Sequence, residues 1–159
     1  MDSSARHLVR DQIEETVEVA APPETVWRFV SDLPRLAEWS PQVVKSIVLG
    51  GGDVHGGSFL FNINRRGLLF WPTRSKVVRF TPPREVAWRI KENGSTWSFT
   101  LEPTATGTRV THRRDLSDGL SDISAKLTDR FMGGQEVFQD ELQAGMRQTL
   151  DRIRQLVES

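Results

Sequence analysis

The stretch "APPETVWRFVSDLPRLAEWSP", residues 21–41, is rich in large apolar side chains, yet its prolines divide it into pieces too short to be stable helices alone. The paired prolines at its start suit a first helical turn, where a missing N–H group costs little. On that helix Val26, Phe29 and Val30 share one face. We therefore predict two short helices, each too short to cross a bilayer and each held in place by packing against the rest of the chain.

The residues on both sides of this stretch predict an antiparallel sheet. Residues 12–20, "QIEETVEVA", alternate apolar and polar side chains, which is typical of a half-buried strand. Breaks rich in turn residues separate six later strand-like runs. These runs are "QVVKSIVL", "GSFLFNINR", "TRSKVVRF", "EVAWRIKE", "STWSFTLEP" and "TRVTHRRDL". We interpret "RGLLFWP", residues 66–72, as the connection between the third and fourth strands.

The last third of the chain is predicted to be helical. From Gln135 onward, apolar residues recur every three or four positions and form one continuous face: Phe138, Leu142, Met146, Leu150, Ile153 and Val157. The order of one strand, two short helices, six strands and a long helix indicates a single α+β domain. We expect residues 12–158 to form this domain and residues 1–11 to be a flexible N-terminus.

Composition narrows the possible functions. The chain of 159 residues carries 21 basic and 21 acidic side chains, so it offers no overall charge that would attract nucleic acid. It contains no cysteine, which excludes disulfides, thiolate metal sites and a catalytic thiol. His7, His55 and His112 lie far apart in the sequence, so we expect no metal and no cofactor. The start "MDSSARHLVRD" lacks an apolar signal-peptide core, and we expect a cytoplasmic protein.

Four features follow one another along the chain, and their order is more specific than any one of them: "VEVAAPPETVWRFVSDLPRLAEWSP", "PPREVAW", "LEPTATGTRVTH" and a long terminal amphipathic helix. Together they resemble the START-like helix-grip superfamily, whose bacterial branch includes the polyketide cyclase/dehydrase, or SRPBCC, proteins. The resemblance covers nearly the whole chain. It implies a curved, seven-stranded antiparallel sheet wrapped around the C-terminal helix, with two short helices after the first strand. It also implies an apolar cavity between sheet and helix, with Leu36 and Trp39 near its rim.

Strand alternation suggests which side chains would line such a cavity. Large aromatic and aliphatic groups share faces of the third, fifth, sixth and seventh strands and of the long helix, a composition typical of a small-molecule pocket. The same composition would also fill a closed core. The predicted ligand-binding residues are Phe59, Phe61, Ile63, Trp88, Trp97, Phe99, Val110, Phe138, Leu142 and Met146.

Three polar residues are candidates for catalysis. If the first and last strands pair, as the resemblance implies, Glu15 would meet His112 or Arg114 across the ladder. An arginine–carboxylate pair would orient a ligand oxygen, and an adjacent imidazole would transfer a proton near neutral pH. The alternative is a structural ion pair at the end of the sheet.

Two segments are candidate cavity gates. The predicted connection places Leu68, Leu69, Phe70 and Trp71 where polar residues are usual, which suggests an apolar flap or a transient membrane contact through residues 67–72. The alternative is that these side chains pack under the long helix. The second segment is Phe131 and Met132, which precede a glycine pair and would swing over the cavity, unless the glycines simply end a helix.

The sequence therefore favours a module that binds a small hydrophobic ligand, such as a lipid, a polyketide or another aromatic compound. An aromatase/cyclase or dehydratase without metal or covalent nucleophile is an alternative, because shape and positioned polar groups alone can promote such a reaction. A protein-interaction module of the toxin or chaperone-activator type is a third. Convergent arginine, histidine and carboxylate groups in the cavity would favour chemistry, and a purely apolar tunnel would favour carriage. The sequence leaves the oligomeric state open.

Overall fold

The computed structural model describes residues 12–116 and 135–159. Its helical elements are α2 (Pro23–Val30), a 3-10 turn (Leu33–Arg35), α3 (Leu36–Trp39) and α5 (Gln135–Glu158). Its strands are β1 (Gln12–Val19), β2 (Val43–Val48), β3 (Phe59–Arg66), β4 (Leu69–Thr81), β5 (Glu85–Ile90), β6 (Thr96–Pro103) and β7 (Thr108–Asp115). None of the helices in this part of the chain combines the length and apolar character needed to span a bilayer.

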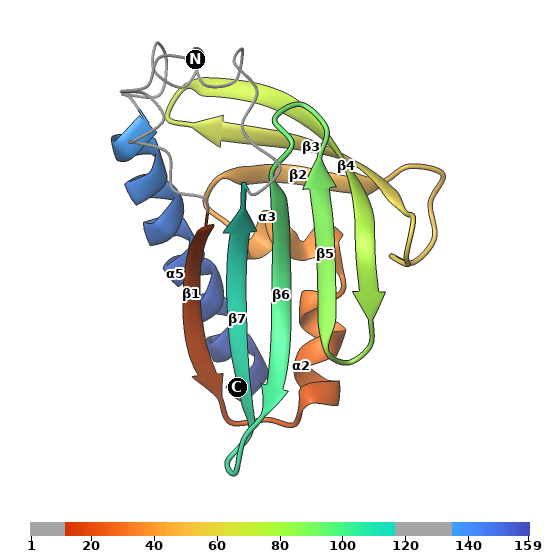
Figure 1. Cartoon of the computed structure of the whole chain (residues 1–159), viewed down its shortest axis with the longest axis vertical. Helices are drawn as coiled ribbons and strands as arrows, with labels where there is room; N and C mark the ends of the chain where they lie inside the picture. The colour runs from red at the N-terminus through yellow and green to blue at the C-terminus, as the bar shows by residue number, and fades with distance from the viewer. Residues whose placement is uncertain (1–11, 117–134) are drawn as a thin grey trace.

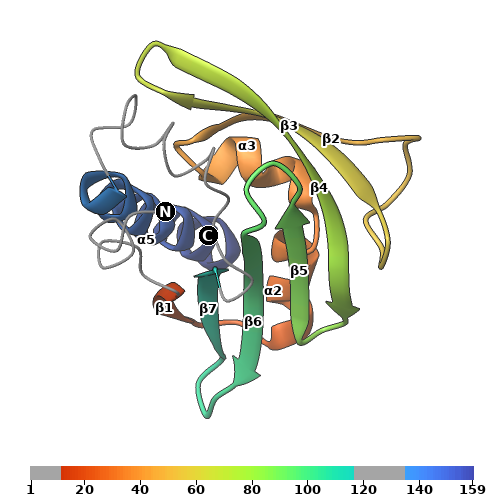
Figure 2. The same cartoon turned by 45° about the horizontal axis from the view of Figure 1, so that its top comes forward.

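The strands form one antiparallel, seven-stranded sheet in the order β1-β7-β6-β5-β4-β3-β2. The first and last strands pair, with Glu15 opposite His112. The sheet curves strongly, so that β2, β3 and β4 cross over the end of the layer that β1 and β5–β7 form (Figures 1 and 2). The helix α5 lies in the concave side and contacts β1, β7, α2 and α3. The predicted α+β helix-grip architecture is confirmed.

The proline-broken stretch closes the open side of this grip. Val26 and Val30 of α2 are fully buried. Trp39, at the end of α3, is also buried, and the guanidinium of Arg35 lies over its ring at 5.3 Å. Both α2 and α3 contact α5, and Figure 2 shows them inside the bend of the sheet. Neither helix is long enough to be stable alone, so their burial between sheet and α5 is what holds them.

The connection between β3 and β4 is much shorter than predicted. We expected a loop over residues 66–72, but β3 ends at Arg66 and β4 begins at Leu69. The turn consists of Gly67 and Leu68, and Gly67 has a φ of +59°. A glycine with positive φ at the first central position is typical of a type II′ hairpin, whose twist matches that of the flanking strands. The apolar residues from Leu69 onward therefore belong to a strand rather than to a loop.

Candidate functional site

A cavity of about 550 Å³ lies between the concave side of the sheet, α3 and α5. Its wall combines aromatic, aliphatic and polar side chains from six strands and two helices. The residues that line it are Leu36, Ser40, Pro41, Gln42, Val43, Asn62, Asn64, Arg65, Arg66, Gly67, Trp71, Thr73, Trp88, Ile90, Asn93, Trp97, His112, Arg114, Phe138, Glu141, Leu142, Ala144, Gly145 and Gln148.

The aromatic part of the wall comes from neighbouring strands. Trp88 of β5 and Trp97 of β6 are register partners, so their side chains lie on the same side of the sheet. Phe138 and Leu142 of α5 face them across the cavity. These four are the predicted ligand-binding residues that the structure brings together at the cavity. Contact with a ligand stays a prediction for all of them.

His112 is the polar centre of this aromatic wall. Its ring stacks on Phe99 with centroids 4.2 Å apart and an interplanar angle of 9°. Its Nδ1 lies 2.9 Å from the carbonyl oxygen of Ser98. Because a carbonyl only accepts, Nδ1 carries the proton and donates, which leaves Nε2 as an acceptor. Burial lowers the pKa of His112 to about 4, against a smaller opposing effect of the bond to Ser98. The ring is therefore neutral at pH 7.

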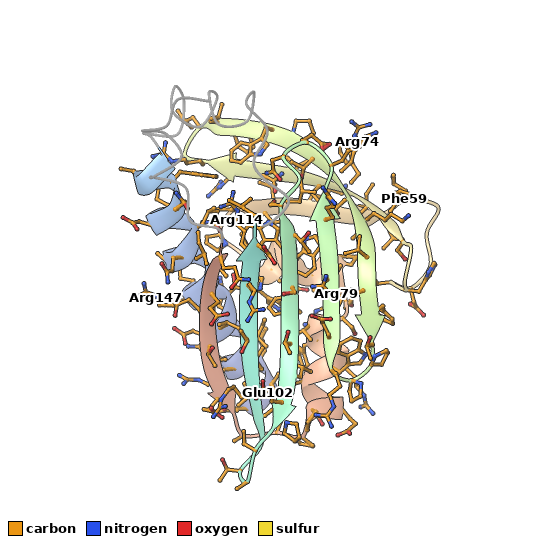
Figure 3. The ribbon with its side chains drawn as sticks, in the orientation of Figure 1. Phe59, Arg74, Arg79, Glu102, Arg114 and Arg147 are labelled. Atoms are coloured by element: carbon orange, nitrogen blue, oxygen red, sulfur yellow. The ribbon has the colours of Figure 1, made fainter. Side chains whose placement is uncertain are left out.

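Arg114 is the next inward-facing residue of β7 and is 4% exposed. It lies opposite Ile13 of β1 and Trp97 of β6 in the sheet. Figure 3 shows it at the upper end of β7. A guanidinium at this depth presents a fixed, always charged donor to the cavity. His112 and Arg114 are thus the two predicted catalytic candidates that line the cavity.

Glu15, the third candidate, does not line the cavity. It lies opposite His112 in the register, but its carboxylate accepts a hydrogen bond from Gln143 at 3.0 Å and forms an ion pair with Arg147 at 3.0 Å. Both partners belong to α5. The predicted meeting across the ladder is therefore confirmed for His112 as a strand pairing, but the Glu15 carboxylate bonds to α5, which lies over this edge of the sheet. A catalytic role for Glu15 stays a prediction.

The inward side of β3 carries polar residues that the sequence did not single out. Asn62 accepts a hydrogen bond from Ser46 at 2.7 Å and donates to Ser75 at 3.3 Å. Asn64 donates to Thr73 at 2.9 Å. Because these amides are held by neighbouring strands, their orientation is fixed before any ligand arrives. In the sequence Asn62 and Asn64 alternate with apolar residues, which indicates a strand with one polar and one apolar side. Hydrophobicity alone led us to predict that the apolar side faces inward.

Consequently the predicted inward face of β3 is wrong. Phe59 is 56% exposed, and Phe61 and Ile63 are half-buried on the same, outward side. Three other predicted ligand-binding residues face inward but are packed in the core instead of lining the cavity. These are Phe99, Val110 and Met146, at 0%, 0% and 2% exposure.

An ion pair joins the two sides of the cavity rim. The Arg66 guanidinium, at the end of β3, donates two hydrogen bonds to the Glu141 carboxylate of α5, at 2.6 and 2.8 Å. The hydrogen bond to Arg66 lowers the pKa of Glu141, and the same bond raises the pKa of Arg66. Both groups therefore stay charged at neutral pH. Their pairing ties the β3–β4 hairpin to the helix.

The predicted gate residues fall into three groups. Trp71 lines the cavity. Leu68, Leu69 and Phe70 are 97%, 38% and 53% exposed, so packing of this run under the long helix is not what the structure shows. Phe131 and Met132 lie outside the described residues. Whether any of these side chains moves over the cavity stays a prediction.

Comparison with known proteins agrees with this geometry. The sequence profile of the family described as polyketide cyclase/dehydrase and lipid transport matches residues 10–158. The solution structure of a Polyketide_cyc-like protein, Cgl2372 from Corynebacterium glutamicum, is similar with 25% sequence identity and a TM-score of 0.64. That alignment covers 92% of this chain and 91% of the other.

Two further solved structures share the fold. The di-domain ARO/CYC protein StfQ, from the steffimycin biosynthetic pathway, is 16% identical with a TM-score of 0.74, and the match covers 98% of this chain but 53% of StfQ. Protein CV1439 from Chromobacterium violaceum is 19% identical with a TM-score of 0.63, covering 94% and 99%. No curated protein sequence matches the chain. The profile match over nearly the whole length shows that the chain belongs to the polyketide cyclase/dehydrase and lipid transport family.

Proposed function

We propose that the protein binds a small, largely apolar molecule that carries carbonyl or hydroxyl oxygens, in the cavity between the sheet and α5. The observation that carries the proposal is the composition of the wall. Indole rings of Trp88 and Trp97 lie on one side, and the fixed amides of Asn62 and Asn64 lie on another. A volume of about 550 Å³ falls in the range of small-molecule sites.

The polar groups would set the orientation of such a ligand. The Nε2 atom of His112 accepts a hydrogen bond from a ligand hydroxyl, and Arg114 donates to a carbonyl or phenolate oxygen. A ligand without oxygen atoms would give the buried Nε2 atom of His112 no hydrogen bond, which costs binding free energy. The site therefore favours oxygenated rings or chains over plain hydrocarbons.

Electrostatics supports binding over acid–base catalysis. A pKa of about 4 makes His112 a good hydrogen-bond acceptor but a weak general base at pH 7. Among the described lining residues the one carboxylate is Glu141, and Arg66 already occupies both of its oxygens. Glu15 is bonded to α5.

A matched pair of probes tests the proposal. We expect 1,8-dihydroxynaphthalene to quench the fluorescence of the cavity tryptophans saturably, with at least about tenfold tighter binding than naphthalene, because only the first satisfies the polar wall. In His112→Phe, which keeps a ring on Phe99 but loses Nε2, that preference should shrink. Phe59→Leu, on the far side of the sheet, is the control and should bind like the parent protein. Equal affinity for both probes, or no saturable binding, would refute the proposal.

A second candidate is a cyclase or dehydratase that acts on a polyketide-like chain. The observation in its favour is that His112 and Arg114 lie on one wall, where they would hold two oxygens of a folded poly-β-ketone. The similar StfQ fold belongs to a protein described as ARO/CYC. Turnover of a synthetic poly-β-ketone thioester should then differ in product distribution between the parent and Arg114→Lys, measured by mass spectrometry. An identical distribution, matching the spontaneous reaction, would leave binding as the function.

A further inference from the structure

The outward side of β2, β3 and β4 is unusually apolar for a sheet face turned away from the core. Strand register places one set of side chains together on it, and we call this set the outer patch. It comprises Ile47, Phe59, Phe61, Ile63, Phe70 and Pro72 with Lys45, Arg65, Arg74 and Lys76. An antiparallel sheet with one solvated face normally places polar residues there.

The most exposed apolar side chains lie at both ends of the β3–β4 hairpin, Phe59 at the start of β3 and Leu68 and Phe70 at the tip. Phe59 and Phe70 are 56% and 53% exposed, and Leu68 at the turn is 97% exposed. Figure 3 shows Phe59 and Arg74 at the periphery, on the other side of the molecule from α5. Leaving such a row of side chains in water costs free energy that contact with an apolar phase would recover.

The charge of the outer patch is positive. Arg74 pairs with Glu92 at 3.0 Å. Among the described residues, no carboxylate forms an ion pair with Lys45, Arg65 or Lys76, and the Lys76 ammonium lies 5.5 Å from the ring centre of Phe59. A second copy of this chain would bring the same cations face to face, so self-association through the patch is opposed by repulsion. An anionic surface is complementary to it.

The outer patch borders the cavity. Arg65 of the patch lines the cavity, as do Gly67 in the turn and Trp71 after it, and all three lie within three residues of Leu68. A surface that contacts the hairpin tip is therefore also next to the cavity in which an apolar ligand would lie. This points to a partner that is both anionic and a reservoir of apolar molecules.

We propose that the outer patch docks on an anionic lipid bilayer. Leu68 and Phe70 enter the interface between head groups and acyl chains, and Lys45, Arg65 and Lys76 contact lipid phosphates. The contact extends the membrane role expected for residues 67–72 to the outward side of three strands. It needs no ligand in the cavity and so stands apart from the proposed binding function.

Vesicle flotation tests the docking. We expect the full-length protein to float with phosphatidylcholine vesicles that contain about 30% phosphatidylglycerol, to bind pure phosphatidylcholine weakly, and to be released as salt rises. Leu68→Asp and Arg65→Glu should each lower the partition coefficient at least about fivefold, because one loses the inserted side chain and the other reverses a contacting charge. Melting temperatures check that both variants remain folded.

Matched controls lie on α5. Leu156→Asp changes another exposed leucine, at 43% exposure, and Arg154→Glu makes the same charge reversal on an exposed arginine. Both should float like the parent, and so should His112→Phe, which alters only the cavity wall. Three results would overturn the proposal: no flotation with anionic vesicles, equal losses in the α5 controls, or sedimentation that shows a dimer abolished by Leu68→Asp.

Discussion

The two halves of the sheet differ in how they distribute apolar side chains between their two sides. In β1 and β5–β7 the inward side chains Phe99 and Val110 are fully buried, and ion pairs such as Arg113–Glu14, at 2.7 Å, cover the outward side. In β3 the order is mixed: the polar Asn62 lies inward beside the buried Leu60, and the apolar Phe59 lies outward. Simple amphipathic alternation thus describes the half that forms core. It fails in the half that serves a cavity on one side and an exposed surface on the other.

The largest test of this contrast compares one phenylalanine from each half. Phe99→Ala should lower the free energy of unfolding by about 3–5 kcal/mol, because the ring is fully buried and stacks on His112. Phe59→Ala should change it by no more than about 0.5 kcal/mol, because a surface change away from caps and networks is usually neutral. Urea unfolding followed by circular dichroism measures both.

The same pair of variants can also contradict the contrast between the two halves. A loss above about 2 kcal/mol in Phe59→Ala would mean that the outward ring packs like a core residue, since losses of this size mark buried side chains. Phe59→Leu serves as the control, because it keeps an apolar side chain on the outward side. If the slope of the unfolding free energy against urea concentration is unchanged in both variants, the denatured state is not altered.

The contrast also explains how much the sequence could predict. Element order and the two short helices follow from period, turn residues and prolines, and the resemblance implied the pairing of the first and last strands; the structure has all of them. The turn at Gly67 was misplaced because we treated the apolar run after it as a loop, although a glycine between two strand-like runs also indicates a two-residue hairpin. The predicted inward side of β3 was wrong because we took the more apolar side of the strand to be the inward one. That inference holds only where no other part of the molecule carries apolar side chains.

The site was less predictable than the fold. In β5–β7 the apolar side chains face inward, as amphipathic alternation assumes. Alternation therefore predicted the correct side for Trp88, Trp97 and His112, which line the cavity. For Glu15 the sequence predicted the strand partner, His112, but not the bonds of the carboxylate, because a strand register does not show that α5 supplies Gln143 and Arg147 to it. Nor does any local pattern join a strand-end arginine to a helix glutamate, which is why the ion pair at the cavity rim was missed.

The second test uses the titration of His112. Its folded-state pKa of about 4 lies below the ordinary value of 6.5 because the ring is buried, so the unfolded chain binds more protons between these values. The stability that the neutral, buried ring gives to the folded state is present above pH 6.5 and is lost as the pH falls toward 4. We expect about 2 kcal/mol less stability from this group at pH 5 than at pH 7. Urea unfolding at both pH values gives the difference.

His112→Gln isolates this group, because the amide has an N–H donor within reach of Ser98 but does not titrate near neutral pH. The variant should lose about 2 kcal/mol of the pH dependence, whatever its stability at pH 7. A pH dependence identical to that of the parent would mean that the imidazole is reached by water in solution. The cavity wall that β5–β7 form would then be more open than the structure indicates.

The smallest test compares charges on the two outward sides. Glu14→Ala removes the partner of Arg113 on an exposed surface, and we expect a loss of about 0.2–1 kcal/mol at low salt that fades as salt screens the pair. Lys45→Ala, from the outer patch, should not lower stability, because its charge repels neighbouring cations instead of pairing with a carboxylate. Urea unfolding in 0.02 M and 0.5 M salt separates the two cases. An equal, salt-sensitive loss of stability in both variants would show that the two outward sides are electrostatically alike. The positive charge of the outer patch would then no longer support docking on an anionic surface.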